Sequence, residues 1–142
     1  MVRERVLFDQ AETLRTVLLD TQIALWMLTD SQRLPAVYRR AAAGPDIRWI
    51  FHQVSLWEIQ IKYDTGKLVL PKSPGDLLPD AIKEAGFFPG ALEDEGIFLL
   101  GKLPPVHRDP FDRLLVAHAI LHGWEIATVD KTVVKYPVRI FS

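Results

Sequence analysis

The sequence of 142 residues contains no cysteine. Disulfide bridges, zinc–thiolate centres, iron–sulfur clusters and thiol nucleophiles are therefore excluded, because each of them needs a cysteine sulfur. A reducing compartment fits this composition. The chemistry of the chain must come from other side chains.

Long apolar runs and an excess of one charge are absent as well. No stretch approaches the roughly 18 apolar residues needed to cross a bilayer, and the longest candidate, residues 114–121, is interrupted by His118. A signal peptide is not expected, because Glu4, Asp9 and Glu12 break any apolar region near the start. We therefore expect a cytoplasmic protein without a membrane partner. The net charge of −1 does not by itself identify a partner.

The sequence does contain enough apolar material for one folded core. Hydrophobic residues make up 49% and charged residues 25% of the chain, which is typical of a globular protein and unlike a disordered one. A length of 142 residues corresponds to one domain. Residues 1–15 are charge-rich and weakly patterned, so we interpret them as an N-terminal extension of a domain at 16–142.

Short apolar runs alternate with helical segments along the chain. We predict strands at residues 16–20, 48–51, 97–100, 125–129 and 138–141, and helices at 23–28, 35–43, 55–63, 76–85 and 110–122. Capping signals support two of the helices, namely a capping box from Ser55 to Glu58 and a helix end at Gly123. This alternation predicts an α/β domain with a central parallel sheet flanked by helices on both faces.

Four acidic residues occupy positions that such a fold would bring together. Asp20 and Asp130 end two predicted strands, whereas Glu58 and Asp112 lie in the first turns of two predicted helices. The carboxyl ends of parallel strands and the starts of the following helices share one edge of a sheet. Carboxylates crowded there repel one another unless a cation neutralises them, and an all-oxygen cluster suits Mg²⁺ or Mn²⁺.

Each of these acids, taken alone, also has a structural explanation. Glu58 and Asp112 occupy capping-box positions, where an acid interacts favourably with the helix dipole. Asp20 and Asp130 could be N-caps of the segments that follow them. The metal hypothesis depends on the four acids together. A metal site of this kind activates water and polarises a phosphoryl oxygen, so it needs no histidine, cysteine or serine nucleophile.

Several short segments carry a motif pattern in a fixed order. They are Leu-Leu-Asp-Thr at residues 18–21, Val-Ser-Leu-Trp-Glu-Ile-Gln-Ile-Lys at 54–62, Gly-Lys-Leu-Val-Leu-Pro at 66–71 and His-Arg-Asp-Pro-Phe-Asp-Arg-Leu-Leu at 107–115. This ordered set resembles the PIN-domain ribonuclease family, and within it the VapC-type toxins of bacterial toxin–antitoxin pairs. The similarity runs from about residue 17 to the C-terminus.

The resemblance implies a fold, an activity and a set of site residues. The sheet order would be 3-2-1-4-5, which places strands one and four side by side and brings Asp20 and Asp130 together. The activity would be that of a Mg²⁺- or Mn²⁺-dependent endoribonuclease toxin, acting on tRNA or rRNA. The metal-binding and catalytic acids carry over onto Asp20, Glu58, Asp112 and Asp130. The hydroxyl side chains expected to hydrogen-bond to these ligands are Thr21, Ser55 and Thr128.

Partners and substrate contacts follow from the same resemblance. A separate antitoxin protein is expected, as is a homodimer, whose apolar surface would come from the early helix with Ile23, Leu25, Trp26 and Leu28. Arg108 and Arg113 could bind phosphate bidentately, with salt bridges to nearby acids as the alternative. His107 precedes the helix of Asp112 and could contact substrate. The chain departs from the commonest family pattern at Gln22 and His118, where His and Gln are expected, which bears on substrate contacts rather than on metal ligands.

Three interpretations other than a nuclease fit the sequence less well. A catalytically inactive PIN-like module could bind RNA or a protein partner, although the intact set of four acids argues against it. A histidine metal site at His118 and His122 lacks the accompanying acid of the HExxH pattern. A phosphatase of the haloacid-dehalogenase type needs a second aspartate two residues after Asp20, and position 22 is Gln.

Overall fold

Five parallel strands form one central sheet in the computed structural model, which describes residues 15–142. The strands are β1 (Arg15–Leu19), β2 (Ile47–His52), β3 (Phe88–Gly90), β4 (Glu125–Ala127) and β5 (Arg139–Ile140). Their order is β3-β2-β1-β4-β5, which confirms the expected sheet order. Apart from Arg15, the extension predicted at 1–15 lies outside the described residues.

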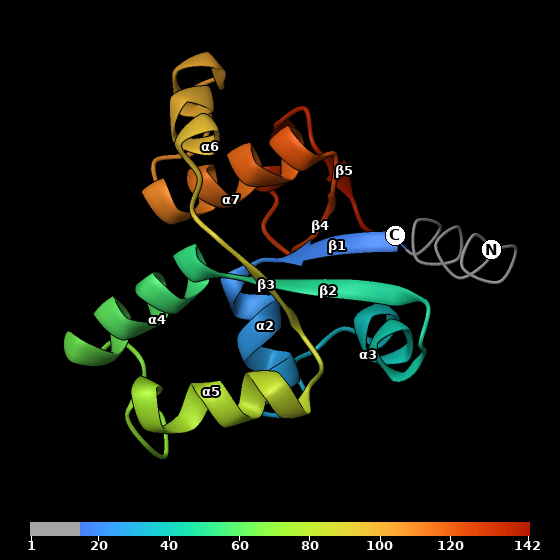
Figure 1. Cartoon of the computed structure of the whole chain (residues 1–142), viewed down its shortest axis with the longest axis vertical. Coiled ribbons are helices and arrows are strands. Elements are labelled where there is room, and N and C mark those ends of the chain that lie inside the picture. Colours follow the sequence, from blue (N-terminus) through green and yellow to red (C-terminus); the bar gives the residue numbers. More distant parts are fainter. Residues whose placement is uncertain (1–14) are drawn as a thin grey trace, which may run out of the picture.

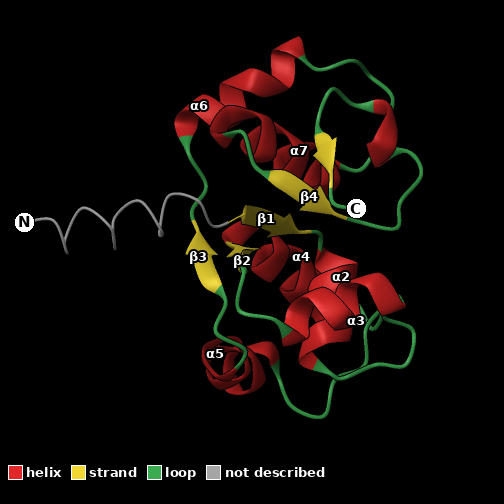
Figure 2. Cartoon of the chain, turned by 90° about the vertical axis from the view of Figure 1, so that its right-hand side faces the viewer, coloured by secondary structure: helices red, strands yellow, loops and turns green. Residues whose placement is uncertain are grey.

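Helices cover both faces of this sheet, as predicted (Figures 1 and 2). They are α2 (Thr21–Leu28), α3 (Ala36–Ala43), α4 (Gln53–Asp64), α5 (Pro74–Glu84), α6 (Asp94–Leu99) and α7 (Pro110–His122), with short 3₁₀ turns η1 (Leu100–Lys102) and η2 (Val133–Lys135). In Figure 1, α6 and α7 lie on one side of the strands and α2, α3 and α5 on the other. None of the helices in the described part of the chain is long and apolar enough to span a membrane.

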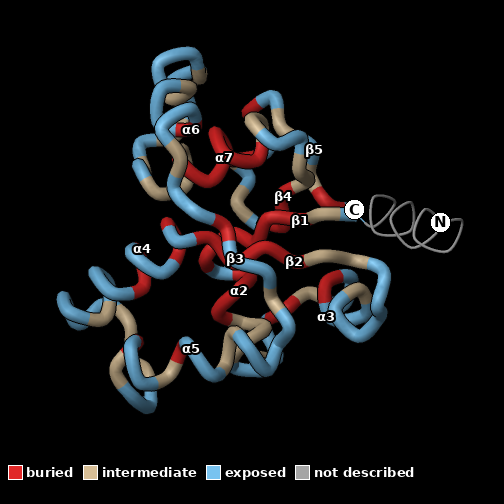
Figure 3. The backbone as a smooth tube through the Cα atoms, in the orientation of Figure 1, coloured by how far each residue is buried: buried red, intermediate tan, exposed pale blue. Residues whose placement is uncertain are grey.

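Two apolar cores form because successive side chains of a strand point to opposite faces. Val17 and Leu19 of β1 pack with α2, α3 and α5 in one core. Leu18 packs with α7 in the other. The strands β1, β2 and β4 and much of α7 are therefore buried between the helical layers (Figure 3). This burial makes the sheet a rigid support for whatever lies at its carboxyl edge.

The prediction of a strand at residues 97–100 is wrong, because that run belongs to α6 and η1. A short apolar run does not by itself distinguish a strand from a helix. The actual third strand is Phe88-Pro89-Gly90, whose composition is poor for a strand. Gly90 is needed there because a Cβ atom would lie 2.7 Å from Cδ2 of His52 on the neighbouring strand.

The capping box predicted from Ser55 to Glu58 is also wrong. The N-cap of α4 is His52, whose ring Nδ1 accepts a hydrogen bond from the Val54 amide. Ser55 lies inside the helix and is buried. The predicted boundaries of α7 are confirmed, because Asp109 accepts from the amides of its first turn and Gly123 ends the helix with a φ of 70°.

The early helix α2, expected to supply apolar surface for a dimer, is buried at Ile23 and Leu25 and half-buried at Trp26 and Leu28. Ile23 and Leu25 are buried in the first core, and Trp26 and Leu28 pack against the same core. The apolar residues of α2 are needed to cover the sheet. The part of α2 that remains accessible for self-association is its C-terminal half, where Trp26 and Leu28 are half-buried.

Candidate functional site

All four predicted acids line one cavity of about 330 Å³ at the carboxyl edge of the sheet. Asp20 directly follows β1, and Asp130 lies three residues after the end of β4. Glu58 and Asp112 come from α4 and α7, which begin near the same edge. The structure therefore brings together carboxylates that are as many as 110 positions apart in the sequence.

Asp20 is held by two hydrogen bonds. Its Oδ1 accepts from the amide of Ile23 at 2.9 Å, so it is the N-cap of α2, and its Oδ2 accepts from the Thr128 hydroxyl at 2.6 Å. Burial raises the pKa of Asp20, and Glu58 and Asp130 raise it further, although the two hydrogen bonds oppose the shift. The two hydrogen bonds therefore fix the carboxylate in position.

Thr128 connects Asp20 to Asp130 and is itself held by a residue that the sequence did not indicate. Its hydroxyl accepts from the Asp130 amide at 3.0 Å while donating to Asp20. The buried Tyr38 hydroxyl donates to the Thr128 carbonyl at 3.0 Å and accepts from the Thr128 amide at 3.1 Å. A tyrosine 90 positions away in sequence carries no local signal for this role.

Glu58 is buried and contacts two donors. The Thr21 hydroxyl lies 2.6 Å from Oε1, and the Lys62 ammonium lies 2.6 Å from Oε2. The Thr21 oxygen also lies 2.9 Å from the Ser55 hydroxyl. A hydroxyl has one proton, so Thr21 donates to Glu58 and accepts from Ser55. Lys62 was not among the predicted site residues, although its spacing of four residues from Glu58 on one helix is the signal for such a pair.

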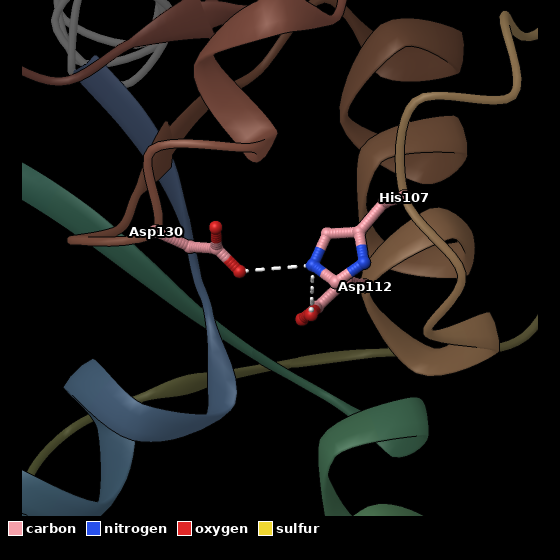
Figure 4. Close-up of side chains that lie close together, drawn as sticks. All are labelled: His107, Asp112 and Asp130. Atoms are coloured by element: carbon pink, nitrogen blue, oxygen red, sulfur yellow. Dashed lines mark hydrogen bonds and ion pairs between the residues drawn. The ribbon is translucent and has the colours of Figure 1, made fainter.

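His107 lies between Asp112 and Asp130 (Figure 4). Its Nε2 is 3.0 Å from Oδ2 of Asp112 and 2.9 Å from Oδ2 of Asp130. Its Nδ1 accepts a hydrogen bond from the Asp109 amide at 3.2 Å, which places the ring proton on Nε2. Burial acts to lower the pKa of His107, but the hydrogen bond to Asp130 and the charge of Asp112 outweigh it, so the pKa is raised.

The two acids beside His107 differ in their electrostatics. Burial raises the pKa of Asp112 to about 7, and the charges of Asp109 and Glu58 add to this effect. The pKa of Asp130 is lowered, because hydrogen bonds from His107 and the Thr132 amide outweigh the cost of burial. With a pKa of about 7, Asp112 is partly protonated near neutral pH, and a cation in the cavity would favour its ionised form.

The donor set fits a hard divalent cation. Four carboxylates share the cavity, and oxygen ligands are those that Mg²⁺ and Mn²⁺ prefer. One ligand atom each of His107, Asp112 and Asp130 lie within 4.8 Å of one another. Since Nε2 of His107 carries the ring proton in this arrangement, it donates to the acids and offers no lone pair. The fit therefore depends on the carboxylates.

The residues predicted to contact substrate do not all lie at the acidic cavity. Gln22 lines the acidic cavity, and Arg108 lines an adjoining one. Arg113 lines neither, because its guanidinium donates to the carbonyls of Leu100 and Pro104. Among residues 15–142, neither arginine makes the salt bridge considered as its alternative role. His118 is fully buried between α6 and α7, away from the cavity.

Comparisons with known proteins agree on one family. The family model of the PIN domain matches residues 17–138. A relative from Mycobacterium tuberculosis (strain ATCC 25618 / H37Rv), Ribonuclease VapC22, is 29% identical over 119 residues, which cover 82% of this chain and 88% of the relative.

Two solved structures share the fold of this chain. The crystal structure of VapBC2 from Rickettsia felis, bound to a DNA fragment from its promoter, matches with a TM-score of 0.66 and 17% identity, over 89% of this chain and 97% of that chain. FitAcB from Neisseria gonorrhoeae matches with a TM-score of 0.60 and 15% identity, over 89% and 96% of the two chains. At these identities the likeness concerns the fold.

Proposed function

Because the chain belongs to the PIN-domain family, we propose that it is a Mg²⁺- or Mn²⁺-dependent endoribonuclease and the toxin of a toxin–antitoxin pair. The observation that carries this proposal is the gathering of Asp20, Glu58, Asp112 and Asp130 around one cavity. The similarity to Ribonuclease VapC22 supports RNA as the substrate. Within RNA, we propose tRNA or rRNA as the target.

Asp20, Glu58, Asp112 and Asp130 would hold the ion in this proposal. When bound, the ion supplies an activated water and polarises the phosphoryl oxygen of the bond to be hydrolysed. Thr128 orients Asp20, and Thr21 and Lys62 orient Glu58, so that the carboxylates need little rearrangement. His107, whose Nε2–H lies beside Asp112 and Asp130, would contact the substrate.

The decisive experiment incubates the purified protein with total cellular RNA, with and without Mg²⁺ or Mn²⁺, and maps the new RNA ends by sequencing. We expect cleavage at defined positions that requires the metal and is lost in Asp20→Asn. RNA that is bound but left intact by the wild-type protein under all metal conditions would contradict the proposal. It would support the inactive RNA- or partner-binding module instead.

The same proposal includes a cognate antitoxin, a homodimer and a cytoplasmic location. The fold shared with VapBC2 and FitAcB supports an antitoxin partner. Light scattering of the protein alone and co-purified with the product of a neighbouring gene tests both assemblies. A monomer at micromolar concentration in both samples would contradict the dimer.

A further inference from the structure

Thr128 lies one residue beyond the end of β4, where the pairing of the central strands stops. The last paired residue of β4 is Ala127, which pairs with Leu19 and whose carbonyl accepts from the Asp20 amide at 3.0 Å. Thr128 is only 7% exposed, and among residues 15–142 no strand pairs with it. Its buried amide and carbonyl therefore need a hydrogen-bond partner from elsewhere in the fold.

Tyr38 satisfies both of these backbone groups with a single hydroxyl. The hydroxyl donates to the Thr128 carbonyl at 3.0 Å and accepts from the Thr128 amide at 3.1 Å. A tyrosine hydroxyl has one proton and two lone pairs, so the two bonds can form together. A phenylalanine ring would fill the same space but could form neither bond. The Tyr38 hydroxyl thus holds the backbone at the point where the sheet no longer does.

The ring of Tyr38 is itself held in the first core. The residue lies on α3, is 4% exposed, and packs in the core that contains Val17 and Leu19. Its ring also contacts Phe141, with ring centroids 5.5 Å apart. Densely packed interiors leave a ring of this size little room to move. The hydroxyl therefore has a fixed position relative to β1 and β4.

Thr128 connects this fixed point to two carboxylates of the acidic cavity. Its hydroxyl donates to Oδ2 of Asp20 at 2.6 Å and accepts from the Asp130 amide at 3.0 Å. Asp20 follows β1 and Asp130 follows β4, which are neighbours in the sheet. A displacement of the Thr128 backbone would therefore move the two carboxylates relative to each other.

Tyr38 has no direct access to whatever the acidic cavity binds. It does not line the cavity, and its hydroxyl proton is used by the Thr128 carbonyl. A direct contact with substrate is therefore not expected. Any influence of Tyr38 on the cavity must pass through Thr128.

We propose that Tyr38 is a positioning residue for the metal site. Through Thr128, it fixes the placement of Asp20 and Asp130 that a divalent cation needs. Mg²⁺ demands a nearly ideal octahedral arrangement of its ligands, so small displacements of these carboxylates weaken its binding. This inference rests on the proposed function, because it takes the two carboxylates as metal ligands.

Metal binding to the purified protein tests the positioning role without an activity assay. Binding of Mn²⁺ is measured by electron paramagnetic resonance, and binding of Mg²⁺ by competition with Mn²⁺, well below the melting temperature. Tyr38→Phe should weaken the binding of both ions by about tenfold, as is typical when a residue that orients metal ligands is lost. Tyr63→Phe, which alters a half-buried tyrosine of α4 outside the acidic cavity, is the matched control and should bind both ions like wild type.

Two further measurements distinguish positioning from a general loss of stability. Hydrogen exchange of the Thr128 amide, followed by NMR in EDTA, should be faster in Tyr38→Phe, because the amide loses its acceptor. Leu78→Ala, in the same core but outside the acidic cavity, should lower the melting temperature and keep the wild-type metal affinity. Unchanged exchange in Tyr38→Phe, or an equal loss of metal affinity in Leu78→Ala, would overturn the inference.

The effect of Tyr38 should also depend on the Thr128 side chain. Thr128→Val removes the hydroxyl that contacts Asp20 and Asp130, so it should itself weaken metal binding. In this background Tyr38→Phe should cause at most about a twofold further loss, because residues that act through one another are not additive. A full tenfold further loss would show that Tyr38 acts by another route and would contradict the inference.

The outcomes separate this inference from the proposed function. If wild type binds the ions with the expected dependence on Tyr38 but cuts no RNA, the nuclease proposal fails and the positioning role stands. If wild type cuts RNA and Tyr38→Phe binds both ions like wild type, only the positioning role fails. A wild-type protein that binds neither ion would contradict both.

Discussion

At the scale of single residues, the side chains of the acidic cavity have structural roles as well as their proposed chemical ones. Asp20 caps α2 through the Ile23 amide and also presents its carboxylate to the cavity. The two roles considered for Asp20 from the sequence, helix N-cap and metal ligand, are therefore compatible. One oxygen satisfies a helix amide, and the same carboxyl group remains within reach of a cation.

The first prediction concerns Asp20→Asn. The amide oxygen can still accept from Ile23, and the amide nitrogen can donate to the Thr128 hydroxyl, so the cap is preserved. One charge is removed from a cluster whose mutual repulsion raises the pKa of Asp20. We expect RNA cleavage to be lost, while the melting temperature in EDTA stays the same or rises.

Cleavage assays and thermal unfolding of the two proteins, side by side, test this expectation. Thr29→Val, which alters a hydroxyl at the far end of α2, is the matched control and should retain activity. An Asp20→Asn protein that cleaves RNA at the wild-type rate would show that Asp20 is structural only.

At the scale of secondary-structure elements, α7 positions Asp112 through its own N-cap. Asp109 accepts from the amides of Phe111 and Asp112, and Pro110 occupies the first helical position, where its missing N–H costs nothing. The negative charge of Asp109 also raises the pKa of Asp112. Asp109 thus affects both the position and the protonation of Asp112.

Substitutions at Asp109 separate these two effects, which is the second prediction. Asp109→Ala should destabilise the protein by about 1 kcal/mol, because the first-turn amides lose their acceptor. Asp109→Asn should retain most of that stability, since asparagine is an equally good cap. Chemical denaturation in EDTA provides the free energies, and equal losses for both variants would contradict a capping role.

The contact between α6 and α7 depends on a glycine at a crowded position. A Cβ atom at Gly96 would lie 2.4 Å from Cε1 of His118. The buried His118 ring cannot move away easily, because Nδ1 is bonded to the Leu114 carbonyl at 2.8 Å and Nε2 accepts from the Glu93 amide at 3.0 Å. This contact allows α6 to pack closely on α7, in the segment where the apolar run at 97–100 suggested a strand.

The third prediction follows from this contact. Gly96→Ala should destabilise the protein by about 1–3 kcal/mol through overpacking against His118. Gly101→Ala is the control, because no atom lies within 4 Å of a Cβ there and the substitution should be neutral or slightly stabilising. Thermal unfolding distinguishes the two. Equal melting temperatures for both variants would show that α6 adjusts without cost.

At the scale of the whole molecule, a buried pair of histidines joins the sheet to the α6–α7 layer. His52 at the end of β2 and His118 on α7 are fully buried, with ring centroids 4.5 Å apart. Burial lowers the pKa of His52 to about 4, and the charge of His118 adds to this effect. Glu93 and His122 also act on His52, with opposite signs.

The pH dependence of stability is the fourth prediction. Below pH 6.5 the unfolded chain protonates His52 whereas the native protein does not, so stability falls as the pH falls from 6.5 towards 4. The loss from this group is on the order of 3 kcal/mol. Asp112 acts in the opposite direction, because its pKa is raised to about 7 and the native state gains from its protonation.

The difference in the free energy of unfolding between wild type and His52→Asn, followed as a function of pH, isolates the contribution of His52 to the pH dependence of stability. Asparagine keeps an acceptor for the Val54 amide, so α4 retains its cap. Denaturant titrations in EDTA at several pH values should show a smaller acid-induced loss in this variant. His122→Asn, at an exposed position of α7, should keep most of the wild-type loss. Parallel curves of unfolding free energy against pH for wild type and His52→Asn would show that His52 does not cause the acid-induced loss of stability.

Local sequence determined the parts of this protein that depend on neighbouring residues. The strands around residues 17–19 and 48–51 and the end of α7 were predictable, because periodicity and capping are local signals. Asp20 and Asp112 also lie where predicted, whereas Glu58 lies in the second turn of α4 and Asp130 three residues after β4. The resemblance carried by ordered motifs supplied the sheet order, which the structure confirms.

Only the tertiary structure decided which side chains meet across the fold. The bridge of His107 to Asp112 and Asp130, the Tyr38 bonds to Thr128, and the third strand all depend on residues distant in sequence. Gly90 allows the strand at Phe88–Gly90 to lie close to His52 of β2, which no local propensity indicates. Contacts of this kind are set by packing between elements, so their physical cause lies in the assembled fold.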